Sequence, residues 1–79
     1  MNIEEINERQ MQVMRENLKL LREQRGWSVK ELSRRSQISP ATLARAEAGG
    51  NFGVLSLLAL CRLYHIRPHE MFHPIQPGP

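Results

Sequence analysis

Residues 28–47 read SVKELSRRSQISPATLARAE, and two helix starts follow one another within this stretch. Ser28 and Glu31 have the spacing of a capping box, in which the serine hydroxyl can accept from the Glu31 amide and the carboxylate can reach back to the Ser28 amide. Ser39 caps the second helix, and Pro40 fills its first position, where no amide is needed. Two helices this short are not stable alone in water, so other helices must bury them. The stretch predicts a helix-turn-helix, a motif that often places its second helix in the major groove of DNA.

An apolar residue precedes each of the two caps. Trp27 with Leu32, and Ile38 with Leu43, have the spacing of hydrophobic staples, which set the angle at which the chain joins each helix. Both staples therefore support helix starts at Ser28 and Ser39.

The composition is that of a small, basic, helical domain. A chain of 79 residues with 41% apolar and only 5% aromatic residues favours one small helical bundle over a sheet. The net charge of +3 favours an acidic partner, although the same charge also serves solubility. The single cysteine excludes an internal disulfide and fits a reducing cytoplasm. We expect neither a signal peptide nor a membrane span, because the N-terminus is acidic and the apolar runs are short.

The remainder of the chain supplies helices that can bury the central pair. Apolar residues recur at spacings near three and four from Ile3 to Leu21, which predicts one long helix over 3–25 that ends at Gly26. Residues 49–53 are rich in glycine and predict a loop. Further helices are expected at 29–35, 40–47, 54–64 and 68–72, with His65 in a left-handed turn. The expected organisation is a helical extension at 1–13, a helix-turn-helix domain at 14–72 and a flexible Pro-rich tail at 73–79.

An ordered set of short motifs runs through the chain: Leu18-x-x-Leu21-Arg22-x-x-x-Gly26-Trp27-Ser28, then Glu31-Leu32-Ser33, then Ser39-x-x-Thr42-Leu43-x-Arg45-x-Glu47-x-Gly49, and Leu57-x-x-Leu60-Cys61-x-x-Tyr64-x-Ile66 followed by Met71-Phe72. Over about residues 14–72 this set resembles the lambda-repressor/Cro-like helix-turn-helix family. The resemblance implies an all-α, five-helix DNA-binding domain, here with an extended first helix. The family consists mostly of bacterial and phage transcription regulators, and its second and third helices form the DNA-binding unit.

The resemblance also implies one ion pair inside the domain. In the family, an arginine of the first helix pairs with a glutamate at the end of the third, and Arg22 and Glu47 occupy these positions. The pair would tie the recognition helix to the scaffold, which is a structural role. The alternative is two separate, solvated surface charges.

The DNA-reading positions implied by the resemblance lie on the third helix. They correspond to Pro40, Ala41, Ala44 and Arg45, of which only Arg45 offers a bidentate donor for a base edge, whereas the two alanines suit thymine methyl groups. Lys30, Arg34, Arg35, Thr42 and Asn51 have the chemistry to reach phosphates, unless they form an ordinary solvated helix face. The candidate DNA-binding residues are Ser28, Lys30, Arg34, Arg35, Ser39, Pro40, Ala41, Thr42, Ala44, Arg45 and Asn51.

Two departures from the family pattern leave a second hypothesis open. Val29 stands where the family often has a phosphate-contacting Gln, and the loop after the third helix, Ala-Gly-Gly-Asn-Phe-Gly, lacks the family's Lys or Arg. The first hypothesis is a sequence-specific transcriptional regulator that binds double-stranded DNA as a homodimer. The alternative is a protein-interaction module on the same scaffold, in which the small side chains of the third helix dock another protein.

The apolar residues of the N-terminal extension, Ile3, Ile6 and Met11, have no obvious partner within one domain. We expect them to pack against the fifth helix or against a second subunit.

Catalysis and metal binding have weaker support in the sequence. Cys61, His65, His69 and His73 recur at intervals of four, a spacing that can hold zinc on an unbroken helix. Pro68 interrupts that helix, and Cys61 suits a small core position, so structural roles are the favoured reading. No spacing supports a catalytic triad or a phosphate-binding glycine loop. We expect no enzyme activity, no cofactor and no metal.

Overall fold

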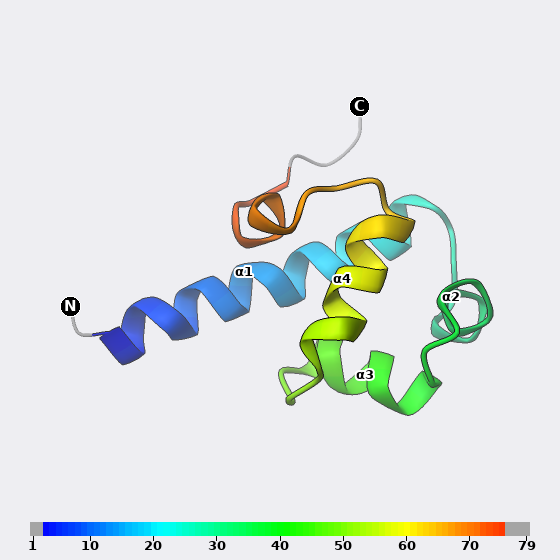
Figure 1. The fold of residues 1–79 in the computed structure, drawn as a ribbon, viewed down its shortest axis with the longest axis horizontal. Helices are drawn as coiled ribbons and strands as arrows, with labels where there is room; N and C mark the ends of the chain where they lie inside the picture. The colour runs from blue at the N-terminus through cyan, green and yellow to red at the C-terminus, as the bar shows by residue number, and fades with distance from the viewer. Residues whose placement is uncertain (1–2, 76–79) are drawn as a thin grey trace.

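The structure is a computed structural model that describes residues 3–75, with the side chains of residues 3, 4 and 6 left aside. Its elements in chain order are α1 (Ile3–Gln24), α2 (Val29–Ser36), α3 (Pro40–Ala48), α4 (Val54–Leu63) and the 3-10 helix η1 (Pro68–Phe72). The described residues contain no strand, which confirms the all-α class. Of the five predicted helices, four are α-helices (Figure 1). The fifth is a 3-10 helix of five residues that begins at Pro68, a length typical of such short connectors.

The long helix α1 runs along one side of the other elements, and its N-terminal part projects beyond them (Figure 1). The predicted extension at 1–13 is, from Ile3 onward, continuous with the rest of this helix. Residues 7–12 are exposed, and the buried stripe begins at Met14 and continues with Leu18 and Leu21. The expected contacts of Ile3 and Ile6 lie outside the described side chains. The helix ends at Gln24, one residue before the predicted end, and Gly26 follows with φ +69°.

Both predicted helix caps are formed. The Ser28 hydroxyl accepts from the Glu31 amide at 3.0 Å, and the Ser39 hydroxyl accepts from the Thr42 amide at 3.2 Å. Between the described residues Ser28 and Glu31, one of the two capping-box hydrogen bonds is formed, from the Glu31 amide to the Ser28 hydroxyl. Within this described pair, the expected bond from the Ser28 amide to the Glu31 carboxylate is not formed. The Glu31 carboxylate instead accepts from Arg34 and Arg35, because two cations one turn further along the helix are stronger partners than one amide.

A single core joins all five elements. Its buried apolar members are Met14, Leu18, Leu21, Leu32, Leu43, Ala46, Leu60, Cys61, Tyr64 and Met71. Trp27 and Ile38, the predicted staple residues, are half-buried and pack against this core, as Leu57 does. The two short helices α2 and α3 are thus stabilised by apolar burial at their inner faces, with each fully buried leucine contributing about 2 kcal/mol.

The chain after α4 is fastened to α1 by one buried amide. His65 adopts φ +56°, as predicted for the turn that ends α4. Asn17 is only 3% exposed, and its side-chain NH2 donates to the carbonyls of Met71 and His73 at 2.7 and 2.8 Å. Its side-chain oxygen accepts from the Ile75 amide at 3.2 Å. The segment 73–75, the start of the tail expected to be flexible, is therefore held against α1, and 76–79 lie outside the described residues.

None of the helices in the described range combines the length and the apolar character that a bilayer span requires.

Candidate nucleic-acid interface

Serine side chains fix the turn between α2 and α3. The Ser33 hydroxyl donates to the Ile38 carbonyl at 2.6 Å, and the Ser36 hydroxyl accepts from the Ile38 amide at 3.2 Å. Gln37 between them adopts the left-handed conformation at φ +61°, a region that few residues other than glycine and asparagine adopt readily. These local bonds set the angle between the two helices, which is the geometry that a helix-turn-helix needs.

One face of α3 is open to solvent, at the edge of the molecule in Figure 1. Leu43 and Ala46 turn inward into the core. The predicted base-reading residues Pro40, Ala41, Ala44 and Arg45 are all exposed. Their spacing of i, i+1, i+4 and i+5 brings them together on a single helix face.

The N-terminal end of α3 carries a pair of hydroxyls. The Ser39 hydroxyl donates to the Thr42 hydroxyl at 2.9 Å while it accepts from the Thr42 amide. Ser39 is exposed and Thr42 is half-buried. Both side chains therefore form part of the helix cap. Only the lone pairs and protons that these bonds do not use are available to an outside partner.

The predicted ion pair between Arg22 and Glu47 is formed. The Arg22 Nε and Nη2 atoms donate to the two carboxylate oxygens of Glu47 at 2.8 and 3.0 Å, and Nη1 donates to the Trp27 carbonyl at 2.8 Å. The two side chains are 14% and 12% exposed. The hydrogen bond to Glu47 raises the pKa of Arg22 above its usual value, against the opposing effect of burial. The pair joins the last turn of α3 to α1 and to the residue that precedes the α2 cap.

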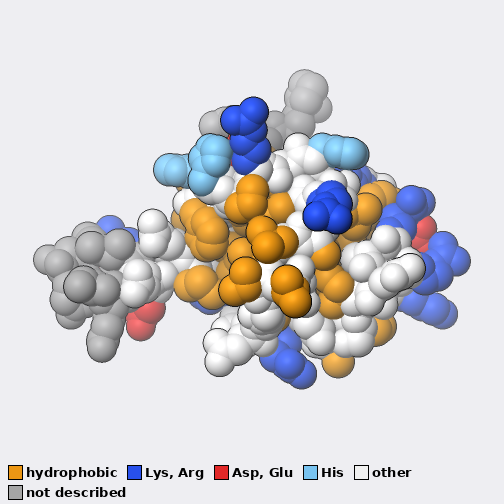
Figure 2. All heavy atoms as spheres, viewed as in Figure 1, with side chains coloured by type: hydrophobic (Ala, Val, Ile, Leu, Met, Phe, Trp, Pro, Cys, Tyr) orange, Lys and Arg blue, Asp and Glu red, His pale blue; other side chains and the backbone are white. Residues whose placement is uncertain are grey.

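The basic residues of α2 are partly neutralised by one carboxylate. Glu31 forms ion pairs with Arg34 and with Arg35, the latter at 2.9 Å, while Lys30 is exposed. The Arg35 guanidinium also lies 4.5 Å from the ring centroid of Trp27. Figure 2 shows basic side chains gathered around α2, with an acidic one among them. Of these two arginines, Arg34 has the more exposed side chain, at 72%.

An aromatic and cationic stack, which the sequence did not reveal, holds Trp27 in place. The Trp27 and Tyr64 rings stack with their centroids 6.1 Å apart. The Arg25 guanidinium lies 4.7 Å from the Tyr64 centroid and 5.7 Å from that of Trp27. Burial raises the pKa of Tyr64 to about 12. Because Arg35 rests on Trp27, this stack also influences where the α2 cations point.

Two consecutive glycines end α3, and an arginine lies against each. Gly49 has φ +101°, and a Cβ placed on it would lie 3.3 Å from Arg15 Nε. A Cβ on Gly50 would lie 2.2 Å from Arg45 Cγ, so the Arg45 stem runs back over this residue. Asn51 follows, exposed in the loop. The structure thus brings Arg45 and Asn51 to the same end of α3, together with Arg15, which sequence reasoning missed.

An apolar patch on α4 was also missed. Val54, Leu55 and Leu58 are 71%, 83% and 41% exposed. Val54 also lines an apolar hollow, together with Met11 and Phe52, among others. Figure 2 shows hydrophobic side chains gathered over α4 on this face.

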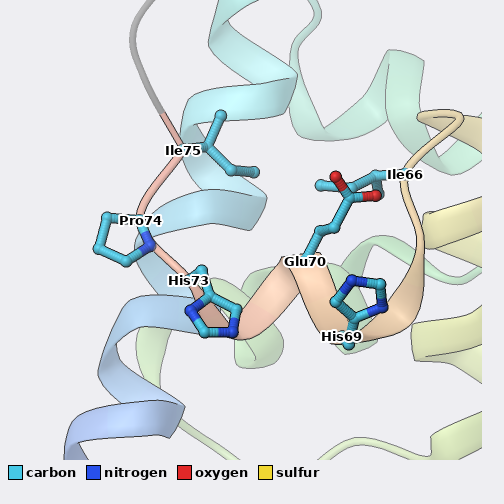
Figure 3. Close-up of a pocket in the computed structure, with 6 residues that line it drawn as sticks. All are labelled: Ile66, His69, Glu70, His73, Pro74 and Ile75. Atoms are coloured by element: carbon cyan, nitrogen blue, oxygen red, sulfur yellow. The ribbon is translucent and has the colours of Figure 1, made fainter.

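The histidines near the C-terminal end line an open pocket on η1. In Figure 3, His69 and His73 lie on either side of Glu70, whose carboxylate points toward Ile66. That carboxylate accepts from the Arg67 amide at 2.9 Å and so caps η1. Cys61 is buried in the core, where desolvation raises its pKa. Across residues 3–75, as far as their side chains are described, no three His, Cys, Asp or Glu residues are grouped to hold a metal ion.

Comparison with known proteins identifies one family. A family model described as helix-turn-helix matches residues 18–71, more than half of the chain and including α2, α3 and α4. Comparison with the curated proteins and with the solved structures gives no match. The matched range includes the serine-capped pair of short helices and both residues of the Arg22–Glu47 pair. The chain therefore belongs to the lambda-repressor/Cro-like helix-turn-helix family of DNA-binding regulators.

Proposed function

We propose that the protein is a sequence-specific transcriptional regulator that inserts α3 into the major groove of double-stranded DNA and acts as a homodimer. The observation that supports it best is the solvent-open face of α3, held by the Ser39 cap at one end and by Glu47 at the other. A helix fixed at both ends presents its side chains in a defined register, which direct readout of bases requires. The function consists of occupying DNA and includes no chemical step.

Each residue of the interface has a proposed role. Arg45 contacts a guanine edge, and Ala41 and Ala44 leave space around it and meet thymine methyl groups. Arg34 is the strongest candidate for a phosphate on α2, because most of its side chain is in solvent. The remaining phosphate and backbone contacts come from Ser28, Lys30, Arg35, Ser39, Thr42 and Asn51, and Pro40 lies with Ala41 on the base-facing side of α3.

Binding of random duplex DNA at low salt, followed by fluorescence anisotropy, is the first test. With ~3–4 phosphates neutralised per subunit, the plot of log K against log salt should have a slope near −3 for one subunit and about double for a dimer. A site selected from a random library is then compared with a scrambled duplex. Arg45→Ala should reduce the preference for the selected site, whereas Arg34→Ala should weaken both duplexes equally. Wild-type protein that binds neither duplex at low salt would exclude this function.

A protein-interaction module remains the second candidate function. It is favoured by the small, weakly polar side chains of Pro40, Ala41 and Ala44 and by the Glu31 carboxylate, which offsets positive charge on α2. On this alternative the same α3 face docks a protein. The anisotropy series separates the two functions, because a protein-docking face gives no steep salt-dependent binding to duplex DNA.

The proposed homodimer has a candidate interface at the start of α4. Large apolar side chains such as Val54 and Leu55 are exposed there on one helix, and contiguous patches of this kind on monomeric proteins are often interaction sites. A second copy is the occupant that this function calls for, since two recognition helices must address two half-sites related by a two-fold axis. Sedimentation equilibrium measures the subunit number directly.

A further inference from the structure

The loop that follows α3 has no cation of its own. Residues 48–53 read Ala-Gly-Gly-Asn-Phe-Gly, so a phosphate beside the end of α3 would find no Lys or Arg in this segment. The fold brings one from α1. The Arg15 Nε, Cδ and Cζ atoms lie 3.3 to 3.4 Å from the point where a Cβ on Gly49 would stand. A Cβ at Gly49 would therefore be in tight contact with the Arg15 side chain.

The position of Arg15 follows from the periodicity of α1. Arg15 and Arg22 are two helical turns apart, and this spacing places both on the same face of α1. That face meets α3, where Arg22 binds Glu47 and Arg15 reaches Gly49. The two arginines thus contact the same last turn of α3, Arg22 at Glu47 and Arg15 at Gly49.

The two arginines differ in what neutralises them. Arg22 has its charge matched by Glu47, whereas no ion pair to Arg15 occurs within the described part of the chain. The Arg15 guanidinium donates from Nη2 to the Gln12 side-chain oxygen at 2.9 Å, a neutral partner on its own helix. Its positive charge is therefore available, and the bond to Gln12 orients it.

A second cation lies at the neighbouring glycine. The Arg45 stem passes over Gly50, close enough that a Cβ there would meet its Cγ atom. Arg15 and Arg45 therefore lie against consecutive residues of one turn, and Glu47, the acidic residue of α3, is paired with Arg22. Glu16, next to Arg15 in the sequence, accepts from the Gln12 side chain at 2.9 Å. The turn at the exposed end of α3 therefore has a guanidinium-bearing side chain against each of its two glycines.

We propose that Arg15 binds a DNA backbone phosphate beside the end of α3 and so supplies the contact that the glycine-rich loop lacks. This role rests on the proposed DNA-binding function and extends it to a residue of α1. Because the contact is to phosphate, it strengthens binding to every duplex alike and carries no sequence preference.

The test compares Arg15→Gln with Arg9→Gln in the full chain. Arg9 is exposed on the projecting part of α1, so its substitution removes the same charge away from the turn. Binding to a random duplex is measured by anisotropy across a salt series, and thermal unfolding is followed by circular dichroism. Arg15→Gln should make the slope of log K against log salt less negative by about 0.9, and Arg9→Gln should leave it unchanged. Arg15→Lys, which keeps the charge, should restore the wild-type slope.

The outcomes separate this role from its rivals. An Arg15→Gln protein with the wild-type slope overturns the proposal. If the same variant also melts at a lower temperature, Arg15 has a structural role at the end of α3 instead. Should Arg15→Gln be unfolded at the assay temperature, Arg15→Met keeps the aliphatic stem against Gly49 and is judged by the same slope. Wild-type protein that fails to bind any duplex at low salt contradicts the DNA-binding function itself, a result distinct from an unchanged slope.

Discussion

Arg22 and Glu47 meet through both carboxylate oxygens, with Nε to Oε2 at 2.8 Å and Nη2 to Oε1 at 3.0 Å, although the residues are 25 positions apart in the sequence. The third Arg22 donor is bound by the Trp27 carbonyl at 2.8 Å. One guanidinium therefore links α1, the start of α2 and the end of α3. The pair is shielded from water on both sides, so each charge depends on the other for its solvation.

Glu47→Ala should lower the free energy of unfolding by about 3 kcal/mol, because it leaves the Arg22 charge partly buried without a partner. Urea denaturation followed by circular dichroism measures the loss. Glu8→Ala, at an exposed position of α1, is the control and should change the stability by less than about 0.5 kcal/mol. A Glu47→Ala protein with the wild-type midpoint would show that the pair has no structural role.

Asn17→Ala should release the segment after η1. The substitution removes two donated bonds and one accepted bond, and it leaves the buried carbonyl of Met71 without this donor. We expect a loss of about 2 kcal/mol in unfolding free energy and faster hydrogen exchange at the Ile75 amide. Asn7→Ala changes the same residue type at an exposed position of α1 and should alter neither. Unchanged exchange at Ile75 in Asn17→Ala would mean that the segment is held by apolar packing alone.

Local features of the fold could be predicted from the sequence, whereas the long-range hydrogen bonds of Asn17 could not. The serine caps and the left-handed turn at His65 are local, since a few neighbouring residues decide them, and each was predicted at the right position. The Asn17 bonds join residues more than 50 positions apart. Nothing near Asn17 in the sequence distinguishes it from an exposed polar residue of α1.

The candidate site shows the same division. The family resemblance predicted which residues of α3 would be exposed, and the buried positions of Leu43 and Ala46 agree with the exposure of the opposite face. It did not predict that Glu31 would prefer two arginines to the Ser28 amide, which depends on side-chain conformations. The position of Arg15 beside Gly49 also required the packing of α1 on α3. The DNA-binding roles themselves stay predictions.

Alkaline pH should destabilise the protein through Tyr64. Burial raises its pKa to about 12, whereas an unfolded tyrosine ionises near 10. The folded state therefore favours the neutral phenol, and this contribution to stability is complete below about pH 10 and is lost as the pH rises toward 12. Tyr64 is the only tyrosine in the chain, so phenolate absorbance reports its titration directly.

Tyr64→Phe provides the control for this pH dependence. The Tyr64 hydroxyl has no hydrogen-bond partner among the described residues, so its removal should cost little stability at neutral pH. The variant should keep its unfolding midpoint to a higher pH than the wild type. An equal loss of stability in both proteins between pH 10 and pH 12 would assign the effect to other groups.

Leu55→Lys should convert the proposed homodimer into monomers. Leu55 is 83% exposed in one chain, and a lysine in a paired apolar interface would bury an unpaired charge in each copy. Sedimentation equilibrium should give the mass of two chains for the wild type and of one chain for the variant. Gln10→Lys adds the same charge at an exposed position of α1 and should leave the mass unchanged. A wild-type protein that sediments as a monomer at high concentration contradicts the dimer.

Gly50→Ala should weaken sequence discrimination without unfolding the protein. The added Cβ would lie 2.2 Å from Arg45 Cγ and 3.0 Å from Arg45 Cδ, so the arginine side chain must leave its present position. If Arg45 reads a guanine edge along its present path, the ratio of affinities for selected and scrambled duplexes should fall about tenfold, the equivalent of about 1.4 kcal/mol. Gly53→Ala is the matched control, since its Cβ meets nothing within 4 Å, and it should keep the wild-type ratio. Equal ratios in both variants, with DNA binding intact, would show that readout does not depend on where the Arg45 stem lies.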